Sequence, residues 1–151
     1  MPSEDARYRT KVYLEQYIDN ANLTEDDDST TVKFIVAYAF PNYPWLRVFQ
    51  DKSVSLVFAI GKPDSDAIID SDRYIIGYNE HVPIFTFAIN KANITGTKLN
   101  WKAETEVRRV VEQYPLGSNR TIQKIQDAEQ NLGSTILYSS LYILSYERDK
   151  I

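Results

Sequence analysis

Cysteine is absent from this chain of 151 residues, and histidine occurs once, at His81. Without cysteine the chain can form no disulfide, no thiolate metal site and no cysteine nucleophile. A serine nucleophile needs a positioned histidine, and no Gly-x-Ser-x-Gly turn accompanies His81. We therefore interpret His81 as a surface or hinge residue and predict that the protein is not an enzyme.

Glycine is also scarce, with five residues in the chain and no two of them within fifteen positions of each other. Loops that bind nucleotide phosphates need glycines only a few positions apart, because the backbone must come close to the phosphate oxygens. The sequence therefore excludes Walker and dinucleotide-binding loops. We expect no nucleotide chemistry and no cofactor.

Long apolar runs are missing too. Runs such as FIVAYAF at residues 34–40 fall far short of the roughly 20 residues that cross a bilayer. The first residues, MPSEDARYRTK, carry acids and lack the apolar segment of a secretory signal. We therefore expect no membrane partner and a protein that stays where it is made. Contents of 43% hydrophobic and 25% charged residues are typical of a folded protein, which we predict to be one domain over residues 1–151.

The negative charge is concentrated near the N-terminus. Residues 1–31 hold 8 of the 21 acidic and 3 of the 17 basic residues, so the other 120 residues hold 13 and 14. Most of the excess lies in TEDDDS at residues 24–29, within an acidic loop over about residues 22–31. Such a block of like charge is typical of a solvated loop. Because the remainder is nearly neutral, we expect no specific nucleic-acid binding, which requires a basic face.

Helical and strand patterns alternate along the first part of the chain. Residues 4–20 are predicted to form a helix, with Ser3 as its N-cap and an apolar stripe at Leu14, Tyr17, Ile18 and Ala21. Residues 31–40 alternate β-branched and aromatic side chains and predict a strand. The two prolines in residues 41–44 predict a turn or an extended corner.

Further strands are predicted in the middle of the chain. Residues 45–50 and 53–60 are expected to pair as a hairpin, since only two residues separate them. Residues 62–72 are then expected to be a polar loop. Two more strands follow at residues 73–78 and 81–91, with Pro83 near the start of the second, where a missing N–H is tolerated.

The last third of the chain predicts one helix and two strands. Asn100 is the expected N-cap of a helix that Pro115 and Gly117 end, and its stripe comprises Ala103, Val107, Val110, Val111 and Tyr114. A polar strand at residues 121–130, a turn at 131–133 and a strand at 134–149 complete the order. Helices placed at separate points between runs of strands cannot supply regular βαβ crossovers. We therefore predict an α+β fold, with a mostly antiparallel sheet and two helices packed on one face.

Two clusters of charged residues are the main candidates for chemistry or binding. Asp64, Asp66, Asp70 and Asp72 could act as an acid–base pair or bind a divalent ion, but Ile69 and Ile75 stand where an EF-hand needs glycine and glutamate. Arg108 lies four residues from both Glu104 and Glu112, and Arg109 lies three from Glu106. This spacing predicts ion pairs on a solvated helix flank, with an inter-subunit contact as the alternative. No catalytic, cofactor-binding or metal-binding residue is predicted.

Three segments carry a resemblance to a known family. They are YPWLRVF at residues 43–49, the helix at 104–114 and SYER at 145–148. Their order is similar to that of the tail terminator, or neck-to-tail joining, proteins of tailed bacteriophages and archaeal tailed viruses. These proteins typically have a first helix, a proline corner before a strand, a hairpin, a later amphipathic helix and a closing strand pair ending in Tyr and Arg. The chain departs from that pattern in the extra strand at residues 32–40 and in the acidic loops.

The resemblance implies a non-enzymatic structural virion protein. Such a protein would assemble with copies of itself into a ring, expected to be a hexamer, at the head-proximal end of the tail. Its partners would be the tail tube and the neck or connector proteins, and it would be made in the host cytoplasm and located in the virion. The alternative is a small cytoplasmic binding module, or a metal-dependent enzyme that uses the carboxylates of residues 64–72.

Overall fold

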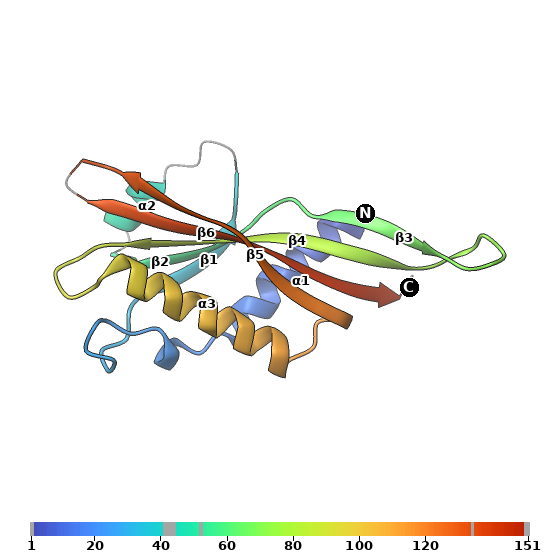
Figure 1. The fold of residues 1–151 in the computed structure, drawn as a ribbon, viewed down its shortest axis with the longest axis horizontal. Helices are drawn as coiled ribbons and strands as arrows, with labels where there is room; N and C mark the ends of the chain where they lie inside the picture. The colour runs from blue at the N-terminus through green and yellow to red at the C-terminus, as the bar shows by residue number, and fades with distance from the viewer. Residues whose placement is uncertain (1, 41–44, 52, 134, 150–151) are drawn as a thin grey trace.

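The computed structural model describes residues 2–40, 45–51, 53–133 and 135–149, which form a six-stranded sheet and its covering helices (Figure 1). Along the chain the elements are α1 (Pro2–Tyr17), the short 3-10 helix η1 (Asn20–Asn22), β1 (Phe34–Tyr38), α2 (Trp45–Asp51), β2 (Leu56–Ile60), β3 (Asp64–Ile69), β4 (Ile75–Ile89), α3 (Gly96–Gln113), β5 (Ser118–Asn131) and β6 (Ile136–Asp149). The predicted α+β class is confirmed.

The sheet is mostly antiparallel, with strand order β1-β2-β4-β6-β5. Only β1 and β2 run parallel within the described residues. Strand β4 pairs with β2 through residues 84–88 and with β3 through residues 75–81. Strands β2 and β3 therefore follow one another along the same edge of β4, and the β3–β4 hairpin extends past the helices at one end of the molecule (Figure 1).

Side chains on the two faces of the sheet enter two separate apolar clusters. In β2, Leu56, Phe58 and Ile60 pack with α1 and α3 on one face, whereas Val57 and Ala59 pack with α2 on the other. This alternation follows from the two-residue period of a strand. The expected packing of two helices on one face is confirmed for α1 and α3, and the short helix α2 lies on the opposite face.

The hairpin predicted from residues 45–50 and 53–60 is wrong, because Trp45–Asp51 is the helix α2. A six-residue apolar run does not distinguish a strand from a buried helical turn. Here β1 and β2 are parallel neighbours, and parallel strands need a crossover connection, which α2 provides. The fold thus contains one β-α-β unit that we had excluded. The corner predicted at residues 41–44 lies outside the described residues.

The polar loop predicted at residues 62–72 is also wrong, because Asp64–Ile69 is the strand β3. The two strands predicted after it are one strand, β4. Pro83 is tolerated inside β4 because its carbonyl oxygen accepts from the Gly61 N–H at 2.8 Å. Its nitrogen faces the same edge and cannot donate in return, but this position lies between the end of β2 and the start of β3, so only one hydrogen bond at a strand end is lost.

The boundaries of both long helices differ from those predicted from the sequence pattern. Helix α1 begins before Ser3, its expected cap, and ends at Tyr17. Helix α3 begins at Gly96, so the predicted N-cap Asn100 lies inside it. The Asp26 carboxylate accepts from the Thr95 N–H at 2.9 Å and from its hydroxyl at 2.7 Å. Because Asp26 is 69 residues away, a local capping rule cannot detect it.

Candidate functional site

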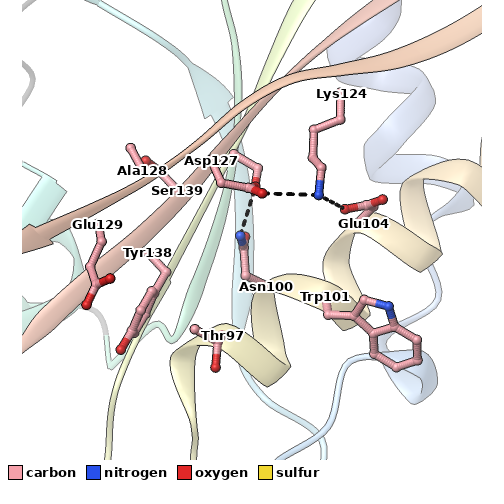
Figure 2. Close-up of a pocket in the computed structure, with 11 residues that line it drawn as sticks. Thr97, Asn100, Trp101, Glu104, Lys124, Asp127, Ala128, Glu129, Tyr138 and Ser139 are labelled. Atoms are coloured by element: carbon pink, nitrogen blue, oxygen red, sulfur yellow. Dashed lines mark hydrogen bonds and ion pairs between the residues drawn. The ribbon is translucent and has the colours of Figure 1, made fainter.

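The groove between α3 and β5 is the first candidate for a binding site, with a volume of about 330 Å³. We call it the α3–β5 groove (Figure 2). Helix α3 lines one side and the β5–β6 hairpin the other. Its lining residues are Thr97, Asn100, Trp101, Glu104, Lys124, Asp127, Ala128, Glu129, Tyr138, Ser139 and Ser140.

Polar side chains in the α3–β5 groove are largely paired with one another. The Lys124 ammonium lies 3.1 Å from a Glu104 oxygen and 3.2 Å from an Asp127 oxygen (Figure 2). The Asn100 amide donates to the Ser140 hydroxyl at 2.7 Å, and Ser140 donates to Asp127. The hydrogen bond from Ser140, together with Lys124, lowers the pKa of Asp127. A charged ligand would have to displace Lys124, so this network serves mainly to fasten β5 to α3.

The four aspartates singled out in the sequence do not converge. Asp64 and Asp66 lie on β3, and Asp70 and Asp72 lie in the following turn. At about 3.3 Å per residue, the ends of this series are roughly 20 Å apart. Asp70 is engaged in the turn, where it accepts from the N–H groups of Asp72 and Tyr74, both at 2.9 Å. Among the described residues, no group of three or more histidines and acids is placed to hold a metal ion.

His81 lies within β4 and contacts neighbouring strands. Its Nε2 is 3.3 Å from an Asp66 oxygen, and its Nδ1 is 2.9 Å from the Ser145 hydroxyl. Asp66 belongs to β3 and Ser145 to β6, so His81 bridges the two neighbours of β4. His81 is thus a histidine on the sheet surface whose two ring nitrogens contact side chains of the neighbouring strands.

Two of the three predicted ion pairs of the arginine doublet are present, and no pair between Arg108 and Glu112 is found among the described residues. Arg108 Nε lies 3.1 Å from Glu104, and Arg109 Nε lies 2.7 Å from Glu106. The solvated interpretation is nevertheless wrong for the second pair, because Glu106 is buried. Glu106 also accepts from the Asp19 N–H at 2.6 Å and from the Asn22 amide at 2.9 Å. The second pair therefore ties α3 to the segment that follows α1.

The acidic loop is exposed over residues 26–31, as predicted, and it is also bound to α3. The buried Lys102 side chain extends into the loop and places its ammonium 2.8 Å from an Asp28 oxygen. The same ammonium donates to the carbonyl oxygens of Thr24 and Glu25. Lys102 and Glu106 fall on the buried side of α3. Opposite charges on an apolar stripe are the sequence signal that could have identified both residues.

Low pH should reduce the stability that the contacts of the acidic loop contribute. Hydrogen bonds from Thr95, Thr30 and Lys102 lower the pKa values of Asp26, Asp27 and Asp28, respectively. A carboxyl whose pKa is lower in the folded chain contributes stability above its unfolded pKa of about 4, and this contribution is lost as the pH falls through the folded value. We expect the free energy of unfolding to fall more steeply below pH about 5 in the natural chain than in the Asp26→Asn/Asp27→Asn/Asp28→Asn variant.

Urea unfolding measured at a series of pH values would test this prediction. The Asp64→Asn/Asp70→Asn/Asp72→Asn variant makes the same change in charge on the hairpin and serves as a control. Parallel pH curves for the natural chain and the loop variant would contradict the expected role of these carboxylates.

The far end of the β3–β4 hairpin exposes several large apolar side chains. We call residues 69–76 the hairpin tip. Ile69, Tyr74, Ile75 and Ile76 are between 38% and 70% exposed there. Among the described residues, which end at Asp149, β6 pairs with β4 as far as Gly77, and no third strand is described beside the tip. Clustered exposed apolar groups are typical of interaction surfaces.

The outer edge of β5 is less suited to pairing with another chain. Strand β5 pairs with β6 alone among the described strands, and register shifts interrupt that pairing between Ser118 and Thr121 and between Lys124 and Gln126. Bulges and lysines on an edge strand typically block the addition of a further strand. The hairpin tip is therefore the stronger candidate for contact with a partner.

Comparison with known proteins adds no assignment to this geometry. None of the helices in the described part of the chain is long and apolar enough to cross a membrane. No protein-family model matches the chain, and no curated protein has a matching sequence.

Proposed function

We propose that the protein is a non-enzymatic structural subunit that works by associating with copies of itself through its hairpin tip. The observation that carries this proposal is the set of exposed apolar side chains at residues 69–76. They lie past the last described pair of β4 with β6 and outside both apolar clusters of the fold. These apolar side chains add nothing to the core of their own subunit. Contact with a partner would bury them, which is the usual role of a clustered apolar surface.

The isolated position of the tip supports the same proposal. A two-stranded hairpin is only marginally stable in water without a further strand or helix against it. Among the described residues, β6 pairs with the base of the hairpin as far as Gly77, and the tip comprises the residues on the far side of that pair. A partner that covers the tip would bury apolar area and hold the two strands together, so association is the favourable state for this segment.

The resemblance to tail terminator proteins supports a specific assembly for this protein. In that form the protein would build a homo-oligomeric ring, expected to be a hexamer, between the tail tube and the neck or connector of a virion, after synthesis in the host cytoplasm. The first helix, the later amphipathic helix and the closing pair of strands agree with the family pattern. The corner at residues 43–44 lies outside the described residues, and residues 45–49 are helical instead of extended.

Light scattering during size-exclusion chromatography would test self-association. We expect the mass of the natural chain to rise above 17.4 kDa with concentration. The Ile69→Ser/Tyr74→Ser/Ile76→Ser variant should remain monomeric, since it removes apolar area from the proposed contact. Its circular dichroism should match that of the natural chain, because these side chains lie outside the core.

A matched variant controls for the loss of exposed apolar residues in general. Tyr8 and Val12 are also exposed, but they lie on α1, so the Tyr8→Ser/Val12→Ser variant should associate as the natural chain does. The proposal fails if the natural chain is monomeric at every concentration, or if the tip variant associates as strongly as the natural chain.

A further inference from the structure

We propose that the hairpin tip of one subunit docks in a groove between the end of α3 and the start of β5 on a second copy of the chain. This inference rests on the proposed self-association and names the surface that receives the tip. We call this surface the receiving groove. Its volume is about 610 Å³, and it is lined by Arg108, Val111, Glu112, Asn119, Arg120, Thr121 and Ile122.

Charge complementarity favours a second copy as the occupant. Residues 64–76 hold four acids and one arginine, a charge of −3, and residues 24–31 hold four acids and no base. Since the whole chain carries −4, the remainder carries +3. The acidic hairpin of one subunit is therefore attracted to the part of another that lies outside its acidic loop, and the same attraction favours correct docking over random contact.

The receiving groove combines apolar and cationic side chains. Ile122 is partly buried and supplies apolar surface, and the buried Val111 lies beside it in the lining. Arg120 donates to the carbonyl oxygens of Val111 at 2.6 Å and Glu112 at 2.8 Å, and within the described residues no carboxylate pairs with it. Its charge is therefore available to an incoming acid.

The side chains of the tip match that combination. Arg108 and Arg120 contribute two guanidinium groups to the lining and Glu112 one carboxylate, so the groove carries a net charge of +1. Guanidinium groups stack on aromatic rings and bind carboxylates through two hydrogen bonds. Tyr74 and Asp72 offer a ring and a carboxylate within three residues of one another. Ile69 and Ile76 add the apolar side chains that suit Val111 and Ile122.

The tip does not occupy the groove of its own subunit, because its side chains are exposed in a chain that contains both surfaces. Two different patches would then meet at each contact, and the contact is heterologous when each tip enters the next subunit instead of being exchanged between two subunits. Repetition of a heterologous contact closes into a ring or continues as a filament, depending on the rotation between neighbours. The inferred contact thus has the symmetry that the proposed ring requires.

Mixing two defective variants would test this contact. The first is the tip variant Ile69→Ser/Tyr74→Ser/Ile76→Ser, and the second is Arg120→Glu, which reverses charge in the groove. Each should be monomeric alone. An equimolar mixture should reach about twice 17.4 kDa and no more, because each pair keeps one intact tip and one intact groove. Thr121→Trp, which fills the groove from an exposed position, provides a second groove variant if Arg120→Glu does not fold.

The outcomes separate this inference from the proposed function. If folded groove variants associate as the natural chain does, the tip docks elsewhere and the inference is overturned while self-association stands. If both single variants are monomeric and their mixture is monomeric too, the head-to-tail contact is overturned. If the natural chain never associates, the proposed function fails and this inference fails with it, and the tip then serves a different protein.

Discussion

Replacing Arg148 with methionine should lower the free energy of unfolding by about 3–5 kcal/mol, because it leaves a buried carboxylate without its partner. Glu80 is 0% exposed, and one of its oxygens accepts from Arg148 Nε at 2.8 Å. The other oxygen accepts from the Ser65 hydroxyl. These three residues join β3, β4 and β6 at the base of the hairpin. The substitution should therefore also loosen the segment that carries the hairpin tip.

Equilibrium unfolding in urea would measure this loss. The Glu80→Gln/Arg148→Met variant removes both charges and should recover much of the stability, since a neutral pair leaves no uncompensated ion. Two results would contradict the stabilising role given to the Glu80–Arg148 pair. One is a loss below about 1 kcal/mol for Arg148→Met, which is within the range of exposed pairs. The other is a double variant as unstable as the single one.

The second large effect is expected for Phe58→Ala, at about 3–5 kcal/mol of unfolding free energy. Phe58 is fully buried on β2, on the face covered by α1 and α3. Its ring meets Phe34 edge to face, with centroids 5.7 Å apart. Truncation removes apolar contacts and leaves a cavity at the centre of the larger cluster, which the surrounding strands can fill only in part.

Phe87→Ala is the matched control, because Phe87 is only partly buried and lies on the opposite face of the sheet. Its loss should be clearly smaller in the same urea experiment, since part of its ring is already in water. Equal losses of unfolding free energy for the two variants would show that the face covered by α1 and α3 does not hold the main core.

Elements with one buried face were predictable from the sequence. The apolar stripe of α3 and the alternation in β6 were identified because burial on one face imposes a period on the residues themselves. The end of α3 before Pro115 was also correct, since proline cannot continue a helix. Strand β5 was identified from its position between a helix and a turn, although almost all of it is exposed.

Elements without such a period were not predictable. Strand β3 carries aspartates and is largely exposed because it projects past the core, so hydrophobicity leaves no pattern along it. Helix α2 is only two turns long, and its apolar residues suit a strand equally well. The hairpin tip was only partly predicted, because residues 73–78 were assigned to a strand whereas residues 69–72, with their acidic neighbours, were assigned to a loop.

Local charge pairs were predictable, but their distant partners were not. The Arg109–Glu106 pair follows from helical spacing. The hydrogen bonds from Asp19 and Asn22 that help bury Glu106 come from residues more than 80 positions away. The cap that Asp26 provides for α3 is of the same kind. Such contacts depend on how the chain returns on itself, which no local pattern encodes.

The sequence by itself determined the α+β class, the presence of the two long helices and the buried face of α3, because burial leaves a period in the residues. It also showed that no disulfide and no glycine-rich phosphate loop can form. Only the tertiary structure decided that β1 and β2 are parallel, that the acidic loop binds Lys102 and that the hairpin tip projects uncovered. These features depend on contacts between distant segments, so they exist only once the chain has folded.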